Sequence, residues 1–430
     1  MTSSLRIPEF KCWPKASFLI ICLFLVGALP IEAQVPTLLH SFTGGIDGGG
    51  PVSTLIRDSV GNLYGATYSG GGHGGFGQGS GTVFQLSPDG NGGWSETVLY
   101  QFTGGADGLN PYGTLLLDGK GNLYGTTLGG GAHKLGTVYK LTPPSSSGGP
   151  WTEKVIYSFA GGNDGESPYA GVIADAKGNL YGTTSGGGGT NSGTVFKLAP
   201  RGPDGWTESV LFRFSFLSGE GPYCSLVMDK DGRLYGTTFR GGNQDGGTVF
   251  VLSPMAGAWN LTFIHHFANL FGGTGDASEP IAGMIIDSLG NLYGTTLAGG
   301  AFGGGAVFEL GRSHGRWQEH VIHSFAGGSD GYIPYGILAF GQSNSLFGTT
   351  EYGGGLGQCF YTTLAYCGTI FKMTRTGSIW SESTYLSFDS SGTLGFTPVT
   401  GVLVNPDGTL YATTGYGGTN DVGTVLAIAP

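Results

Sequence analysis

A proline and an aromatic residue recur seven times at one fixed separation, and this register limits the folds open to the chain. The two residues always stand 13 positions apart, while successive prolines lie 60, 57, 54, 58, 54 and 64 residues apart. A constant interior with connections of variable length indicates a repeated structural unit, and a period above about 40 residues with strand-like content is typical of propeller blades. The pairs are Pro51/Tyr64, Pro111/Tyr124, Pro168/Tyr181, Pro222/Tyr235, Pro280/Tyr293, Pro334/Phe347 and Pro398/Tyr411.

Each repeat has the pattern of four short antiparallel strands. In the second copy we expect these strands over 114–118, 123–127, 136–141 and 151–159, where β-branched and aromatic residues are frequent. Glycine makes up 87 of the 430 residues but lacks the triplet period of collagen, and it falls at turns and at one position of the second strand. We attribute that strand glycine to crowding where blades converge near the axis. The sequence therefore predicts an all-β protein, a seven-bladed β-propeller of four-stranded antiparallel blades.

The seventh blade lacks a fourth strand of its own at the end of the chain. Segment 37–42 matches the end of a fourth strand without its tryptophan, so we expect the N-terminal strand to close the last blade. Closure would remove the exposed sheet edges that an open array leaves. Six fourth strands run from a tryptophan to a phenylalanine eight residues on: Trp94/Phe102, Trp151/Phe159, Trp206/Phe214, Trp259/Phe267, Trp317/Phe325 and Trp380/Phe388.

The first 33 residues have the pattern of a secretory signal peptide. Basic residues precede an apolar core over 16–28, and small Ala33 stands before Gln34 as a cleavage point. The alternative is an uncleaved membrane anchor, but the apolar core is short for a segment that must span about 20 residues. We therefore predict a signal peptide over 1–33, a single propeller domain over 34–430, and a periplasmic, cell-surface or secreted location.

Net charge limits the classes of partner expected for the chain, and the cysteines indicate a disulfide. Cleavage removes three bases and two acids from the 19 basic and 29 acidic residues, which leaves 16 against 27, a net charge of −11. No basic cluster stands out along the sequence, so nucleic acid and anionic membranes are not expected as partners. Cys359 and Cys367 share one inserted loop and are predicted to form a disulfide outside the cytoplasm. Cys224 is expected to be a small buried apolar residue.

Several motifs together resemble a known repeat family. They are the Asn-Leu-Tyr-Gly-Thr-Thr core, the glycine run after it, Gly-Thr-Val-Phe-Lys-Leu, and Ser-Phe-x-Gly-Gly-x-Asp-Gly. This set resembles the Gloeo/Verruco (GloVer) tandem repeat of exported bacterial proteins over roughly residues 35–430. The resemblance implies export and a repeat architecture, and it supplies no catalytic residues to carry over.

The loops between blades carry a recurring acid, in Asp47, Asp107, Asp164 and Asp330. We call the face that holds these loops, together with the glycine-rich loops between second and third strands, the upper face. A ring of carboxylates there could attract Ca²⁺ or a cationic ligand. The other interpretation is that Asp-Gly forms a turn whose carboxylate accepts backbone N–H groups, and repetition in every blade favours it. No metal ligands are assigned and no cofactor is expected, with Ca²⁺ left open.

Tyr112, Tyr169, Tyr223 and Tyr335 directly follow the fixed-register proline in four copies. If those strands are innermost, the tyrosines surround the upper mouth of the central channel. They could stack on sugar rings there, or pack against one another and close the mouth; packing is the usual fate of strand aromatics.

The sixth copy has an expanded upper loop over 353–368, which is our preferred contact element. It contains Phe360 and Tyr361 between the two paired cysteines, although tolerance of insertions also explains such a loop. Elsewhere, His265 and His266 are adjacent on a strand and point to opposite faces, so we expect them to pack and not to share one metal ion.

No nucleophile elbow, zinc-binding His-Glu-x-x-His helix, P-loop or dinucleotide fingerprint is present in the sequence. A pair of carboxylates for glycoside hydrolysis stays open, because distances between acids are not visible in a sequence. The sequence predicts an exported, non-catalytic binding or scaffold propeller that recognises carbohydrate or protein at its upper face. The competing hypothesis is a carbohydrate-active hydrolase or lyase that uses upper-face carboxylates.

Overall fold

The computed structural model of the chain describes residues 34–72, 79–146, 148–202, 205–268, 276–354 and 367–430. Within them, helix is limited to three short 3₁₀ turns, η1 (Phe216–Ser218), η3 (Gly328–Asp330) and η4 (Gln342–Asn344). No helix in these ranges has the length and apolar character needed to cross a bilayer. Residues Gln34–Pro430 form one compact unit. The predicted signal peptide, 1–33, lies outside the described residues and stays a prediction.

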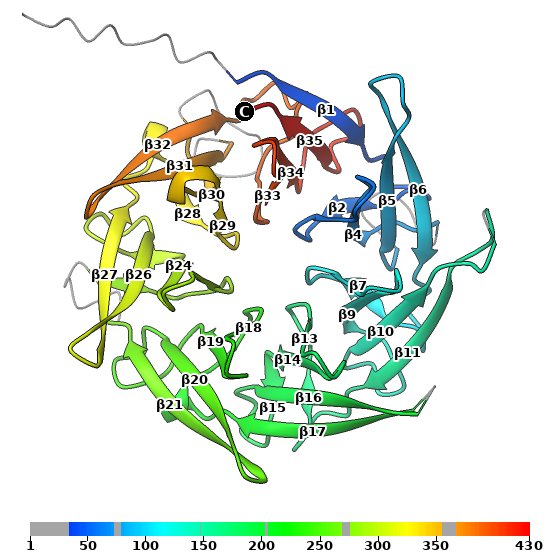
Figure 1. Cartoon of the computed structure of the whole chain (residues 1–430). Coiled ribbons are helices and arrows are strands. Elements are labelled where there is room, and N and C mark those ends of the chain that lie inside the picture. Colours follow the sequence, from blue (N-terminus) through cyan, green and yellow to red (C-terminus); the bar gives the residue numbers. More distant parts are fainter. Residues whose placement is uncertain (1–33, 73–78, 147, 203–204, 269–275, 355–366) are drawn as a thin grey trace, which may run out of the picture. The chain divides into compact units, whose positions relative to one another are not determined.

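Seven antiparallel sheets follow one another in chain order around a ring, which confirms the seven-bladed propeller (Figure 1). The first three blades consist of β2 (Gly49–Pro51), β3 (Ile56–Arg57), β4 (Leu63–Ser69), β5 (Thr82–Pro88) and β6 (Trp94–Gln101); β7 (Leu109–Pro111), β8 (Leu116–Leu117), β9 (Leu123–Gly129), β10 (Thr137–Thr142) and β11 (Thr152–Ser158); and β13 (Ile173–Ala174), β14 (Leu180–Thr184), β16 (Thr194–Arg201) and β17 (Gly205–Arg213).

The other four blades repeat this order from the inner to the outer strand. They consist of β18 (Val227–Met228), β19 (Leu234–Thr238), β20 (Thr248–Met255) and β21 (Ala258–His266); β23 (Ile285–Ile286), β24 (Leu292–Thr296), β26 (Ala306–Ser313) and β27 (Arg316–Ser324); β28 (Tyr332–Pro334), β29 (Ala339–Phe340), β30 (Leu346–Tyr352), β31 (Thr369–Thr376) and β32 (Ile379–Ser387); and β33 (Leu403–Val404), β34 (Leu410–Thr414), β35 (Thr424–Ile428) and β1 (Pro36–Ser41). Two small ribbons pair β12 (Gly165–Glu166) with β15 (Gly186–Gly187) and β22 (Ala277–Ser278) with β25 (Ala298–Gly299).

The inner strand is shorter than the sequence predicts. The strand expected over 114–118 is shortened to β8, and a separate fragment, β7, precedes it; both pair with β9. The interval between them contains Gly113, where an added Cβ would meet the backbone N of Gly171 in the next blade. Near the axis, therefore, the chain lies against the neighbouring blade's backbone and leaves its own ladder.

The glycine of the second strand is explained by an aromatic ring on the third strand. Gly182 on β14 pairs with Phe196 on β16, and a Cβ at Gly182 would lie 2.6 Å from the Phe196 Cζ atom. The predicted explanation of this glycine, crowding between converging blades, is wrong, because the crowding ring belongs to the same blade. The ring lies over the glycine because any side chain there would occupy the ring's place.

The same ring also contacts the preceding blade. Phe159, just after the outer strand of the second blade, meets Phe196 edge-on at 5.1 Å between ring centroids. Such contacts recur at six junctions at 5.0–5.2 Å: Phe42/Phe84, Phe102/Tyr139, Phe159/Phe196, Phe214/Phe250, Phe267/Phe308 and Phe325/Phe371. Buried apolar side chains of the described residues form one cluster at each of the seven junctions. The core is therefore distributed between blades.

The seventh blade changes both members of the glycine–aromatic pair together. Ala412 stands where the other copies have glycine, and it pairs with Leu426 where they have an aromatic residue. A methyl group is added on one strand and ring volume is removed on the next. This exchange keeps the total volume of the pair nearly constant, which is what a close-packed interior requires.

The N-terminal strand closes the last blade, as predicted. β1 pairs antiparallel with β35, from Pro36 opposite Ile428 to Ser41 opposite Thr424 (Figure 1). Phe42, directly after β1, is fully buried and contacts Phe84 of the first blade. The beginning and the end of the described chain thus share one sheet, so the ring is joined by hydrogen bonds and by an aromatic contact.

Truncation of the closing side chain should destabilise the whole ring. Phe42→Ala is expected to lower the free energy of unfolding by about 3–5 kcal/mol, because it leaves a cavity at the closing junction. Val35→Ala is the matched control, since Val35 is 75% exposed, and it should change stability by less than about 0.5 kcal/mol. Urea unfolding of the mature protein measures both. Equal stabilities for the two variants would contradict the closing role of Phe42.

A double-mutant cycle tests the glycine–aromatic pair. Gly182→Ala should destabilise the protein through its clash with Phe196, and Phe196→Leu should destabilise it through lost volume. Combined, they recreate the Ala412/Leu426 pair of the seventh blade, so the double variant should be more stable than the sum of the two losses by about 1 kcal/mol or more. Urea midpoints of the four proteins give the coupling. Additive losses would show that the ring does not determine the glycine.

Candidate functional site

The predicted tyrosines line a single cavity at the centre of the ring. Tyr112, Tyr169, Tyr223 and Tyr335 occupy the same register position in four blades, directly after the inner-strand proline. Together with residues from the other three blades they surround a cavity of about 80 Å³. A drug-sized ligand needs about 300 Å³ or more, so a sugar ring would not fit inside. Any larger ligand has to lie on the exposed rim of these side chains.

The tyrosines belong to a longer row of aromatic residues, which we call the aromatic arc. Its ring centroids are 6.2 Å apart for Tyr68–Tyr112, 4.2 Å for Tyr112–Tyr169, 5.1 Å for Tyr169–Tyr223 and 5.7 Å for Tyr223–Phe239. The arc comes from the first four blades, and its end residue Tyr68 is 41% exposed. The two end residues were missed from the sequence. Both stand four positions after the recurring tyrosine of the second strand, Tyr68 on β4 and Phe239 directly after β19. That shared register is the signal that could have found them.

The buried hydroxyl groups of Tyr112 and Tyr335 stay protonated at any physiological pH. Burial raises the pKa of Tyr112 well above its ordinary value, and the neighbouring hydroxyls of Tyr335 and Tyr169 raise it further. Burial raises the pKa of Tyr335 in the same way. The tyrosine side chains pack against one another, which is the alternative that strand aromatics favour, and they also keep hydroxyl donors at the mouth.

The predicted loop acids lie at separate blade junctions, and each one holds its own turn. Asp107 accepts the backbone N–H of Thr103 at 2.8 Å and the Tyr100 hydroxyl at 3.1 Å. Asp164 likewise accepts the N–H groups of Ala160 and Gly165. These contacts are those of an Asp-Gly turn.

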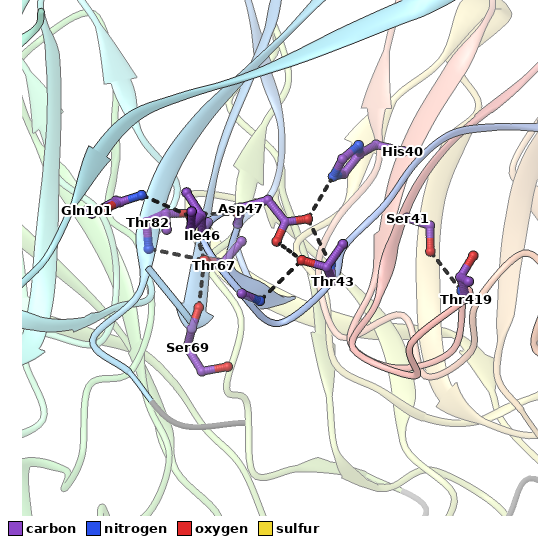
Figure 2. A network of polar contacts seen from close by, with 11 residues as sticks. His40, Ser41, Thr43, Ile46, Asp47, Thr67, Ser69, Thr82, Gln101 and Thr419 are labelled. Atoms are coloured by element: carbon purple, nitrogen blue, oxygen red, sulfur yellow. Dashed lines mark hydrogen bonds and ion pairs between the residues drawn. The ribbon is translucent and has the colours of Figure 1, made fainter. Parts of the chain in front are cut away.

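Asp47 shows the same arrangement beside a histidine. It accepts the backbone N–H of Thr43 at 2.8 Å and the Thr43 hydroxyl, with His40 Nε2 3.5 Å away (Figure 2). Burial opposes ionisation here, but the neighbouring His40 side chain and the hydrogen bonds from Thr43 outweigh it and hold the pKa of Asp47 below its ordinary value. Asp330 accepts the Ala326 N–H at 2.6 Å and bonds His323 Nε2 at 2.8 Å. The carboxylates are thus engaged within the protein.

The expanded loop of the sixth blade lies mostly outside the described residues. Cys359, Phe360 and Tyr361 fall there, so their predicted contact role stays a prediction. Cys367 is described; it is buried and disulfide-bonded, and its pairing with Cys359 stays a prediction. Cys224 is a free, buried cysteine, as expected.

A set of glutamates at the blade junctions was missed. The second residue after the tryptophan of the fourth strand is a glutamate in five of six copies: Glu96, Glu153, Glu208, Glu319 and Glu382. In each, the Oε1 atom is buried and has no hydrogen-bond partner among the described residues. Burial raises the pKa of each of these carboxyls to about 7. The recurring Trp-x-Glu pattern was visible in the sequence, but its proximity to the loop aspartates was not.

Lysines that are scattered in the sequence meet in one groove between the second and third blades. The groove has a volume of about 1000 Å³ and contains Lys120, Lys140, Lys154 and Lys177 beside Trp206. A sequence without a basic cluster thus folds into a surface with one, because each lysine comes from a different strand or turn. The exclusion of anionic partners therefore stays a prediction.

Comparison with protein-family models identifies the repeat. The model described as the Gloeobacter/Verrucomicrobia repeat matches residues 28–148, 73–274 and 260–430 in tandem. The chain belongs to the Gloeobacter/Verrucomicrobia repeat family. This confirms the resemblance seen in the motifs and agrees with the repeated blades of the fold. No protein of curated function matches the chain in sequence.

Solved structures resemble the chain at low identity. A Lactobacillus plantarum protein has a TM-score of 0.49 and 12% identity, with 79% of this chain and 86% of that chain covered. A Bacteroides uniformis protein described as a candidate 6-phosphogluconolactonase has 0.48 and 13%, with 81% and 87% covered. A Trichoderma reesei carbohydrate-active enzyme of family AA12 has 0.45 and 12%, with 92% and 96% covered. These likenesses are too low to transfer an activity or a ligand.

Because of the junction glutamates, we expect this protein to become less stable as pH rises. With a folded pKa near 7 and an ordinary value of 4.5, Glu153 and Glu208 bind more protons when folded, so the free energy of unfolding falls as pH rises from about 4.5 to about 7. Glu153→Gln cannot ionise and should stabilise the protein at pH 8 by about 1 kcal/mol after solvent screening, with little effect at pH 4.5. Glu208→Gln should behave alike. Urea unfolding at both pH values measures this; curves parallel to the wild type would contradict it.

Proposed function

We propose that the protein is an exported, non-catalytic binding propeller that recognises carbohydrate through the aromatic arc at its upper mouth. The observation that carries the proposal is the arc itself, five aromatic side chains in consecutive contact across four blades. Aromatic faces suit the apolar C–H surface of a sugar ring, and hydroxyls that stay protonated can hydrogen-bond its oxygens. The predicted signal peptide supports export.

The rim geometry favours a chain over a single sugar. The cavity under the tyrosines is too small for a sugar ring, while Tyr68 and Phe239 extend the arc beyond the cavity on both sides. A ligand that lies across the rim would meet several rings in succession. We therefore propose an extended polysaccharide as the ligand, with a protein partner as the alternative outcome of the experiment.

The competing function is a hydrolase or lyase that uses the junction carboxylates. One observation favours it: Glu96, whose pKa is raised, lies near the loop aspartate Asp47, whose pKa is lowered. Catalytic acid pairs show this kind of separation of pKa values. Against it, Oε1 of every one of the junction glutamates is buried, so a substrate oxygen has no access to it. A general acid must come within hydrogen-bond reach of its substrate. Binding without catalysis therefore has the stronger support.

The experiment is a screen of the mature protein against soluble polysaccharides that records binding and product release in parallel. Tyr68→Ala and Tyr223→Ala are expected to weaken binding about 3–10-fold each, through loss of stacking. Phe340→Ala is the matched control, because Phe340 on β29 is also 41% exposed but lies outside the arc; it should bind normally. Released product would refute the non-catalytic function. Equal losses in all three variants would refute the arc as the site.

A further inference from the structure

Two neighbouring blade junctions bring together a histidine, an aspartate and a glutamate. Between the fourth and fifth blades these are His265, Asp276 and Glu319; between the fifth and sixth they are His323, Asp330 and Glu382. In each set, one ligand atom of every side chain lies within 4.8 Å of the others. The histidine comes from the outer strand of one blade, and the glutamate comes from the outer strand of the next. Each set therefore spans a junction.

The first set contains polar atoms that the described part of the protein leaves unsatisfied. Nε2 of His265 and Oε1 of Glu319 are both buried without a hydrogen-bond partner there. The distance from His265 Nε2 to Asp276 Oδ1 is 3.7 Å, which is too long for a hydrogen bond. His266, by contrast, accepts the N–H of Asn243 on the other side of the strand. Unpaired buried polar atoms are costly, so they point to a missing partner at this place.

In the second set, His323 already bonds Asp330 at 2.8 Å, and Oε1 of Glu382 is the buried atom without a partner. His323 and Asp330 would have to separate slightly to admit an ion between them. Both sets are otherwise alike in residue types and in the strands that carry them. The distance between the histidine Nε2 atom and the aspartate Oδ1 atom is longer in the first set, 3.7 Å against 2.8 Å.

Other junctions of the same chain show what the histidine adds. Where the histidine position holds Tyr100 or Tyr157, the hydroxyl donates directly to Asp107 at 3.1 Å or to Asp164 at 3.0 Å. Between the third and fourth blades the position holds Phe212, and the glutamate position then holds Leu261. The glutamate is thus present where a polar partner is present. A phenol donates its own proton to the loop aspartate, although Oε1 of the glutamate stays without a partner at those junctions too. An imidazole nitrogen, by contrast, is a metal ligand.

We propose that each of these two junctions binds one Zn²⁺ ion between adjacent blades. Imidazole nitrogen and carboxylate oxygens are established zinc donors at about 2.0–2.2 Å, and three protein ligands leave a fourth position for water. Ca²⁺ fits less well, because it takes six to eight oxygen ligands. Each ion joins the outer strands of two blades and satisfies the buried donor atoms. This inference is independent of carbohydrate binding at the mouth.

The test is a calorimetric titration of chelator-treated mature protein with ZnCl₂. It is done in a His40→Tyr background, because His40, Asp47 and Glu96 form a third junction of the same composition (Figure 2 shows His40 and Asp47). We expect two Zn²⁺ per chain and a rise in Tm of about 2–4 °C at saturation. CaCl₂ at the same concentration should leave Tm unchanged.

The decisive variant is His265→Tyr combined with His323→Tyr, which copies the tyrosine junctions of this chain and should therefore fold. It should lose both ions, and Glu319→Gln or Glu382→Gln alone should lose one each. His320→Gln is the control, since His320 is an exposed neighbour of Glu319, and it should keep both. No saturable Zn²⁺ binding, or two ions still bound in the double variant, would overturn the proposal. Near-UV circular dichroism verifies that each variant is folded.

Discussion

The aromatic ring on the third strand of six of the seven blades is the contact on which the other packing depends. Phe196 covers Gly182 in its own sheet and meets Phe159 of the preceding blade, so one side chain joins two strands and two sheets. Because a single blade cannot bury both faces of its sheet, these junction contacts constitute the core. Phe84 of the first blade receives Phe42 from the N-terminal strand, so the same kind of contact joins the seventh blade to the first.

Around this shared core, two radial zones differ in chemistry. The inner strands bring tyrosines to a narrow mouth. The rings of the aromatic arc pack against one another there, and the buried Tyr112 hydroxyl stays protonated. The outer strands bring loop aspartates, junction glutamates and a histidine, tyrosine or apolar residue into contact between blades. The first zone suits an external ligand, since part of it is exposed. The second suits an ion or a proton, since its unpaired oxygens are buried.

Much of the fold could be predicted, because its determinants are local or periodic. The recurring proline–aromatic register, as in Pro51/Tyr64, located all seven blades. Segment 37–42, which matches the end of a fourth strand, predicted the closing strand. The turn role of Asp107 followed from Asp-Gly chemistry alone. The break in the inner strand and the origin of the Gly182 requirement were not predicted correctly. Both depend on which atoms lie opposite a backbone position, and a repeat period carries no such distance.

The sequence by itself determined the number of blades, their order, their closure and the family, because strand and turn preferences act over a few residues and the repeat multiplies each signal seven times. Only the tertiary structure decided which side chains share a site. Tyr68 joined Tyr112, four lysines gathered in one groove, and His265 came to face Glu319 of the next blade. These neighbours lie roughly one repeat apart or belong to different strands, so their proximity exists only after the blades have packed.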